Sequence, residues 1–76
     1  MILETKELEP IGTNAYFLGD SVTKQAFIVD APMGAYAWAL SLSERTGCTI
    51  SALLLTHGHW DHILDATLFA EADIPI

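Results

Sequence analysis

The sequence has a single cysteine, Cys48, so no disulfide can form within the chain. A lone thiol is typical of proteins that work in a reducing compartment. Basic residues are also scarce: three stand against ten acidic ones, which gives a formal net charge of −7. Because phosphate groups are repelled by a negative surface, this balance disfavours nucleic-acid binding.

Long apolar runs are missing as well, and no stretch reaches the roughly 18 residues that a membrane-spanning helix needs. The N-terminal segment "MILETKELEP" mixes charges with its apolar residues and has neither the basic nor the continuous apolar region of a signal peptide. We therefore expect a soluble cytoplasmic protein without membrane contact.

The chain is short for its apolar content. Its 76 residues make at most one small domain, yet 51% of them are hydrophobic. A domain of this size buries only about 60% of its unfolded surface and usually needs a metal, disulfides or a partner for stability. The composition indicates a part of a larger layered protein, in which both faces of a sheet are covered.

Hydrophobic periodicity and turn residues predict strands and helices of the α/β class. The predicted strands are 2–8, 13–18, 26–30 and 49–55; the predicted helices are 35–46 and 63–72; and "DIPI" at the end begins a further strand. The polar turn "GDSVTKQ" predicts a hairpin, and Gly47 ends the first helix. The alternation of helix and strand that follows predicts parallel pairing. The run Ala52–Leu55 has no alternation, which predicts an interior strand buried on both faces.

All three histidines of the chain lie in the stretch "THGHWDH", residues 56–62, which follows the predicted strand 49–55. Open α/β sheets place their sites at this carboxyl edge. His57 and His59 are two residues apart, so in an extended segment their imidazoles lie on one side and can bind one metal.

Asp61 and His62 complete the cluster, and neither a regular helix nor a regular strand would gather all four side chains. A tight loop entering a helix could, and Gly58 permits the backbone angles that such a loop needs. The H-E-x-x-H pattern of another class of zinc enzymes is absent, because Asp61 stands four residues after His57.

The spacing H-x-H-x-D-H resembles the signature of the metallo-β-lactamase-fold hydrolases. The segments "TNAYFLGD" and "AFIVDAPMGA" are similar to N-terminal strands of that family. Residues 1–76 as a whole resemble the N-terminal part of one such domain, an αβ/βα sandwich that is incomplete at the C-terminus.

The resemblance implies two metal ions, with His57 and His59 as ligands of the first and with Asp61 and His62 as ligands of the second. Asp61 would also be the catalytic residue. Asp30 would support the site without binding metal; the alternative is a plain turn residue before Pro32. Zinc suits these ligands, and manganese or iron would also be accepted.

The activity implied is that of a metal-dependent hydrolase, in which metal-bound hydroxide attacks a small-molecule substrate. Our first choice of substrate is a thioester or related ester, as in the hydroxyacylglutathione hydrolase branch.

The sequence departs from the family pattern in two places. Many members follow the motif with a pair of glycines, whereas this chain has Leu64 and Asp65, and we expect Asp65 to be a solvated helix acid. No histidine follows His62, so the family's later ligands are absent. The alternative function is therefore a truncated, non-catalytic chain or subunit, which pairs an exposed strand edge with a second copy or with the remainder of the domain.

Overall fold

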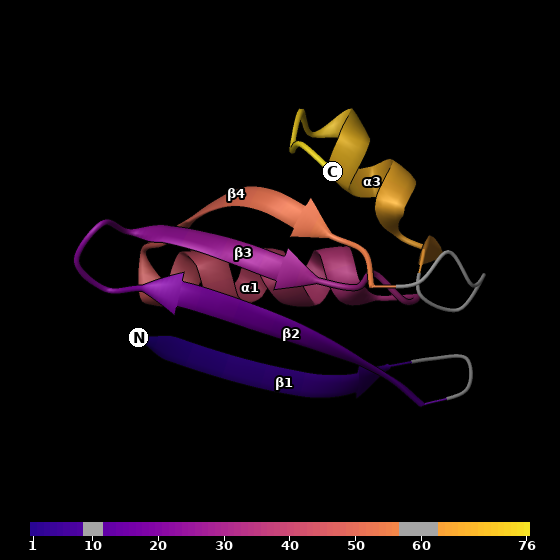
Figure 1. The fold of residues 1–76 in the computed structure, drawn as a ribbon, viewed down its shortest axis with the longest axis horizontal. Coiled ribbons are helices and arrows are strands. Elements are labelled where there is room, and N and C mark those ends of the chain that lie inside the picture. The colour runs from indigo at the N-terminus through magenta and orange to yellow at the C-terminus, as the bar shows by residue number, and fades with distance from the viewer. Residues whose placement is uncertain (9–11, 57–62) are drawn as a thin grey trace.

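The computed structural model describes residues 1–8, 12–56 and 63–76. Its centre is a four-stranded sheet of order β1-β2-β3-β4 (Figure 1). The strands are β1 (Ile2–Leu8), β2 (Thr13–Asp20), β3 (Gln25–Val29) and β4 (Thr49–Leu54). The first three pair antiparallel, which confirms the predicted hairpin, and β4 pairs parallel with β3 as the intervening helix predicts.

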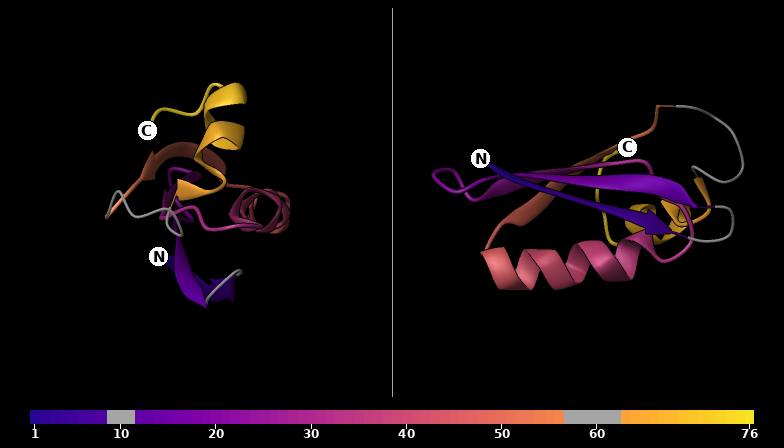
Figure 2. Two further views of the ribbon diagram at one scale, coloured as in Figure 1. Left: turned by 90° about the vertical axis from the view of Figure 1, so that its right-hand side faces the viewer. Right: turned by 90° about the horizontal axis from the view of Figure 1, so that it is seen from below.

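Helix α1 (Ala35–Thr46) lies along one side of the sheet (Figure 2). Small residues on its inner face, Ala35 and Ala39, are fully buried, which allows close packing on the sheet. They share a core with alternate residues of the two central strands, Ala15, Phe17, Ala26 and Ile28. The helix ends as predicted at Gly47, whose φ of 75° is left-handed and whose N–H donates to the Ser43 carbonyl at 2.9 Å.

Helix α3 (Ala66–Glu71) is shorter than the predicted helix 63–72. Its buried Phe69 meets Tyr36 of α1 edge to face, with ring centroids 5.1 Å apart, and so attaches α3 to α1. None of the helices in the described ranges is long and apolar enough to cross a membrane.

The segment after α3 returns to the sheet. The Leu53 N–H of β4 donates to the Pro75 carbonyl at 2.8 Å, so the C-terminal residues lie beside β4. Residues 74–76 are not assigned as a strand, and the further strand predicted for "DIPI" is thus represented by this one contact.

The sheet face opposite α1 is open. Side chains that alternate with the buried ones reach solvent there, and the exposed fractions are 60% for Leu3, 37% for Tyr16, 42% for Phe27 and 51% for Leu54. The prediction that β4 is buried on both faces is therefore wrong for this chain. The apolar pattern is present, but nothing in the described part of the chain covers that side.

Candidate functional site

The four predicted metal ligands, His57, His59, Asp61 and His62, lie outside the described residues. The structure describes the residues on either side of them: Thr56 before the motif, and Ile63 to Asp65 after it. Among the residues that are described, no group of three or more His, Cys, Asp or Glu side chains could hold a metal. The geometry of the site is therefore that of its two flanks.

Asp30 holds the flank that precedes the motif. Its Oδ1 accepts the Thr56 N–H at 2.8 Å, and its Oδ2 accepts the Thr56 hydroxyl at 2.7 Å. Its own N–H donates to the Leu54 carbonyl at 2.8 Å, at the end of β4. The side chain is only 3% exposed, and both carboxylate oxygens are used.

The backbone at Asp30 has a φ of 66°, in the left-handed region that few residues other than glycine adopt. Aspartate tolerates it better than most. The plain-turn reading of Asp30 accounts for the backbone angle, but it does not account for bonds to residues 24 to 26 positions away. A supporting role at the metal site stays a prediction, because the ligands themselves are outside the described ranges.

Asp65 holds the flank that follows the motif. Its N–H donates to the Ala31 carbonyl at 2.8 Å, while its Oδ2 accepts the N–H groups of Gly34 at 3.1 Å and Tyr36 at 2.9 Å. It is 8% exposed, so the prediction of a solvated helix acid is wrong. The carboxylate turns away from its own helix α3, to which it gives no side-chain cap, and toward α1.

The Asp65 carboxylate bonds to α1 because the start of that helix lacks a capping side chain of its own. The first N–H groups of a helix have no partner within it, and a Ser, Thr, Asp or Asn usually accepts one of them. The residue in that position here is Gly34, which has no side chain to offer. Asp65 supplies the cap from 29 to 31 residues away, and its negative charge is favourable beside the positive end of the helix dipole.

The loop between β3 and α1 therefore contacts the chain on both sides of the motif. Asp30 binds Thr56, and the segment 31–36 binds Asp65. This loop leaves the carboxyl end of β3, beside the carboxyl end of the parallel strand β4 (Figure 1). Ligand sites of α/β sheets occur at this edge.

The sequence contains only part of the information needed to predict the capping role of Asp65. "APMGAY" lacks a capping side chain at the start of a well-formed helix, which indicates that some remote acceptor is needed. Nothing in the local pattern identifies Asp65 as that acceptor.

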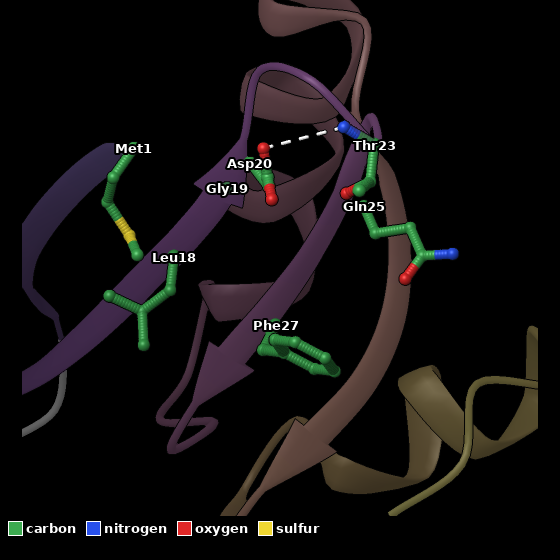
Figure 3. A pocket seen from close by; sticks show the side chains of 7 residues that line it. All are labelled: Met1, Leu18, Gly19, Asp20, Thr23, Gln25 and Phe27. Atoms are coloured by element: carbon green, nitrogen blue, oxygen red, sulfur yellow. Dashed lines mark hydrogen bonds between the residues drawn. The ribbon is translucent and has the colours of Figure 1, made fainter.

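A cavity of about 360 Å³ lies at the other end of the sheet, beside the turn between β2 and β3 (Figure 3). It belongs to the open face, with Leu18 and Phe27 among its lining residues. Among its described lining residues the one carboxylate is that of Asp20, whose Oδ1 accepts the N–H groups of Val22 at 2.8 Å and Thr23 at 3.4 Å within its own turn. These two bonds, that of Val22 first, hold the pKa of Asp20 below its ordinary value of 3.8. Neither Thr56 nor Asp65, the described residues that flank the motif, is among the lining residues of the cavity.

Comparison with known proteins gives a family match over most of the chain. The family described as the Metallo-beta-lactamase superfamily matches residues 8–75. An uncharacterized protein of Mycobacterium tuberculosis is 38% identical over 56 residues, which are 74% of this chain and 25% of that protein. A thioesterase of Emericella nidulans is 41% identical over 54 residues, which are 67% of this chain and 15% of the thioesterase.

The fold is similar to that of solved proteins. The crystal structure of the B3 metallo-beta-lactamase BLEG-1 superposes with a TM-score of 0.77 at 38% identity, over 97% of this chain and 35% of that one. The chain thus spans about a third of the solved relative and about a quarter of the mycobacterial one. The likeness confirms the predicted α/β fold as an N-terminal portion of this architecture.

Proposed function

The chain belongs to the metallo-beta-lactamase superfamily, and from that premise we propose that it is the N-terminal part of a metal-dependent hydrolase acting on a thioester or related ester. The observation that carries the proposal is the family match over residues 8–75, which includes the whole H-x-H-x-D-H motif. The two flanks of the motif support it, because both are fixed at the carboxyl edge of parallel strands.

The donor atoms of the motif fit a metal. Three imidazoles and one carboxylate suit zinc, and they also suit manganese or iron. We assign His57 and His59 to one ion, and Asp61 and His62 to a second. When bound, the ions would supply an activated water and a positive charge beside the developing oxyanion. Within the described chain, the contribution to catalysis is to hold the flanks, which Asp30 and Asp65 do.

The ester specificity rests on a narrower basis. The relative from Emericella nidulans is named a thioesterase, and its similarity covers 67% of this chain. A thioester carbonyl suits attack by an activated water, since the thiolate is a good leaving group. The hydroxyacylglutathione hydrolase type of substrate is the specific case that we propose to test first.

The test measures zinc content and thioester hydrolysis on the purified chain. We expect zinc to bind and hydrolysis to follow, with both lost in a variant that combines His57→Ala and His59→Ala. Glu44→Gln is the matched control, because Glu44 is an exposed acid on the outer side of α1. Hydrolysis that survives in the double variant would refute the assignment of these ligands.

A second candidate function is favoured by the open sheet face. Leu3, Phe27 and Leu54 are 60%, 42% and 51% exposed, and an apolar face of this kind marks an interaction surface. The solved relative is almost three times as long as the matched region. We propose that the occupant of this face is the remainder of a domain of that length, and that the 76 residues alone are not catalytic.

Metal content separates the two candidates. A chain that binds about two zinc ions and turns over a thioester is an enzyme by itself. A chain that is metal-free and self-associates needs its partner, and coexpression with the remaining two-thirds of a relative's domain should then restore both solubility and zinc binding.

A further inference from the structure

Asp65 connects the end of the motif loop to the segment that leads from β3 into α1. It follows residues 57–62, and its backbone and side chain are bound to the segment 31–36. Thr56, which precedes the same loop, is bound to Asp30, the residue immediately before that segment. Both ends of the loop are therefore anchored on one short stretch of chain.

We propose that Asp65 is a positioning residue for the metal-binding loop, and that it fixes the loop by capping α1 across the fold. The part of the proposal that concerns metal rests on the proposed function. The part that concerns the loop anchors rests on described contacts alone.

The contact between Asp65 and the segment 31–36, here called the anchor, is strong. One oxygen of Asp65 accepts two backbone N–H groups, at 3.1 Å from Gly34 and 2.9 Å from Tyr36, and a carboxylate is a stronger acceptor than a neutral oxygen. A third bond runs in the opposite sense, from the Asp65 N–H to the Ala31 carbonyl at 2.8 Å. Three bonds between the same two segments fix position and orientation together.

The anchor also lies close in sequence to the predicted metal ligands. Only residues 57–64 separate Thr56 from Asp65 in the sequence, so this holds for both described flanks of the motif. When one end is released, metal binding must itself order the loop, and affinity falls by that cost. Residues that orient metal ligands from behind typically change affinity or activity by about 10- to 100-fold when mutated.

Asp65 also compensates for the residue at the start of α1. The capping position of that helix is occupied by Gly34, which has no side chain to accept a hydrogen bond. A glycine at position 65 would leave the start of α1 without its acceptor. The aspartate and the uncapped helix thus form a matched pair within this chain.

The experiment compares Asp65→Ala, Asp65→Asn and Gly47→Ala in the full chain. Asp65→Ala removes the acceptor, whereas Asp65→Asn keeps one uncharged oxygen in the same place. Gly47→Ala is the matched control, because it strains the opposite end of α1 at a φ of 75°, where the added Cβ meets nothing within 4 Å. It therefore weakens the same helix without contact with the loop.

Two readouts are needed. The first is amide hydrogen exchange of the metal-free chain at Gly34, Tyr36 and Thr56; the second is zinc affinity, measured by competition with a chelator. We expect Asp65→Ala to speed exchange at all three amides and to weaken zinc binding by about tenfold. Asp65→Asn should recover most of both effects, and Gly47→Ala should change neither Thr56 nor zinc affinity.

The amide of Thr56 decides the matter, since it is bonded to Asp30 and not to Asp65. If Asp65→Ala speeds exchange at Gly34 and Tyr36 but leaves Thr56 equal to the Gly47→Ala control, Asp65 merely caps α1 and the positioning role is overturned. If the unmutated chain binds no zinc, the proposed function fails for this chain, while exchange at Thr56 still confirms or overturns the positioning role.

Discussion

Replacement of Asp30 by alanine is the most severe test of how the motif is held. The change removes the two Asp30 carboxylate oxygens that accept the Thr56 N–H at 2.8 Å and the Thr56 hydroxyl at 2.7 Å. The Asp30 side chain is only 3% exposed. The change also places alanine at a φ of 66°, where a Cβ is unfavourable and aspartate is better tolerated.

The expected loss can be worked out from these contacts. Hydrogen bonds to a charged acceptor contribute about 1.5–3 kcal/mol each. Thr56 itself is exposed, so water can pair its released N–H and hydroxyl groups and no further penalty is added. Removal of the buried charge offsets part of this loss of stability, because the cost of desolvating the Asp30 carboxylate no longer opposes folding. We expect a net loss of about 3–4 kcal/mol, against a total of about 4–11 kcal/mol for a chain of this length at typical stability per residue.

The assay is urea unfolding followed by circular dichroism, with Asp30→Asn, Asp30→Gly and Thr56→Val alongside. Asparagine keeps an acceptor and tolerates the backbone, so we expect a loss of about 1–2 kcal/mol. Glycine adopts a positive φ without strain but, like alanine, lacks the carboxylate. The difference between Asp30→Gly and Asp30→Ala therefore gives the cost of backbone strain, and Asp30→Gly alone gives the cost of the lost hydrogen bonds. In a double-mutant cycle, Asp30→Asn and Thr56→Val should couple, because both alter the same bond. A loss under about 1 kcal/mol for Asp30→Ala would refute the reasoning, since two bonds to a buried carboxylate could not then be worth their usual amount.

Three further changes test other parts of the fold. Gly19→Ala should lower the free energy of unfolding in urea by about 1–3 kcal/mol, because the added Cβ would lie 3.1 Å from a Phe17 ring atom and 3.3 Å from the Cys48 sulfur. An unchanged unfolding midpoint would show that Phe17 and Cys48 move aside without loss of stability. Asp20→Ala should destabilise at neutral pH but not in acid. The pKa of Asp20 is lowered on folding, so its contribution is present above the ordinary value of 3.8 and is lost as pH falls through the folded value. A difference from the unmutated chain that does not shrink as the pH is lowered below 3.8 would contradict this. Phe27→Lys, at a side chain 42% exposed on the open face, should reduce self-association in sedimentation velocity with little change in unfolding; undiminished association would place the contact elsewhere.

The sequence predicts those elements that depend on local signals. The hairpin follows from a polar turn between two apolar runs, and the end of α1 follows from Gly47, whose left-handed φ of 75° matches the expected helix stop. The parallel pairing of β3 with β4 follows from the helix between them. Each of these rests on residues within a few positions of one another.

The errors arise where a residue acts across the fold. Asp65 stands before a helix, where an acid is usually solvated, yet its carboxylate caps a different helix whose own N-cap residue is a glycine. Leu54 and Leu55 have the continuous apolar pattern of an interior strand but are 51% and 36% exposed. The pattern indicates what such a strand is built to contact, and it cannot indicate whether that contact is present in a given chain.

The flanks of the motif and the open face differ in what they need from the rest of a domain. The carboxylates of Asp30 and Asp65 accept hydrogen bonds from Gly34, Tyr36 and Thr56, so these anchors of the motif loop form within this chain. The open face is formed by alternate residues of all four strands, and its burial requires a separate layer. Changes at the anchors should therefore act on the loop whether or not the face is covered, whereas changes such as Phe27→Lys should act only through the covering layer. A chain in which Phe27→Lys weakened zinc binding as strongly as Asp65→Ala would show that the two parts are coupled, and the separation argued from their contacts would be wrong.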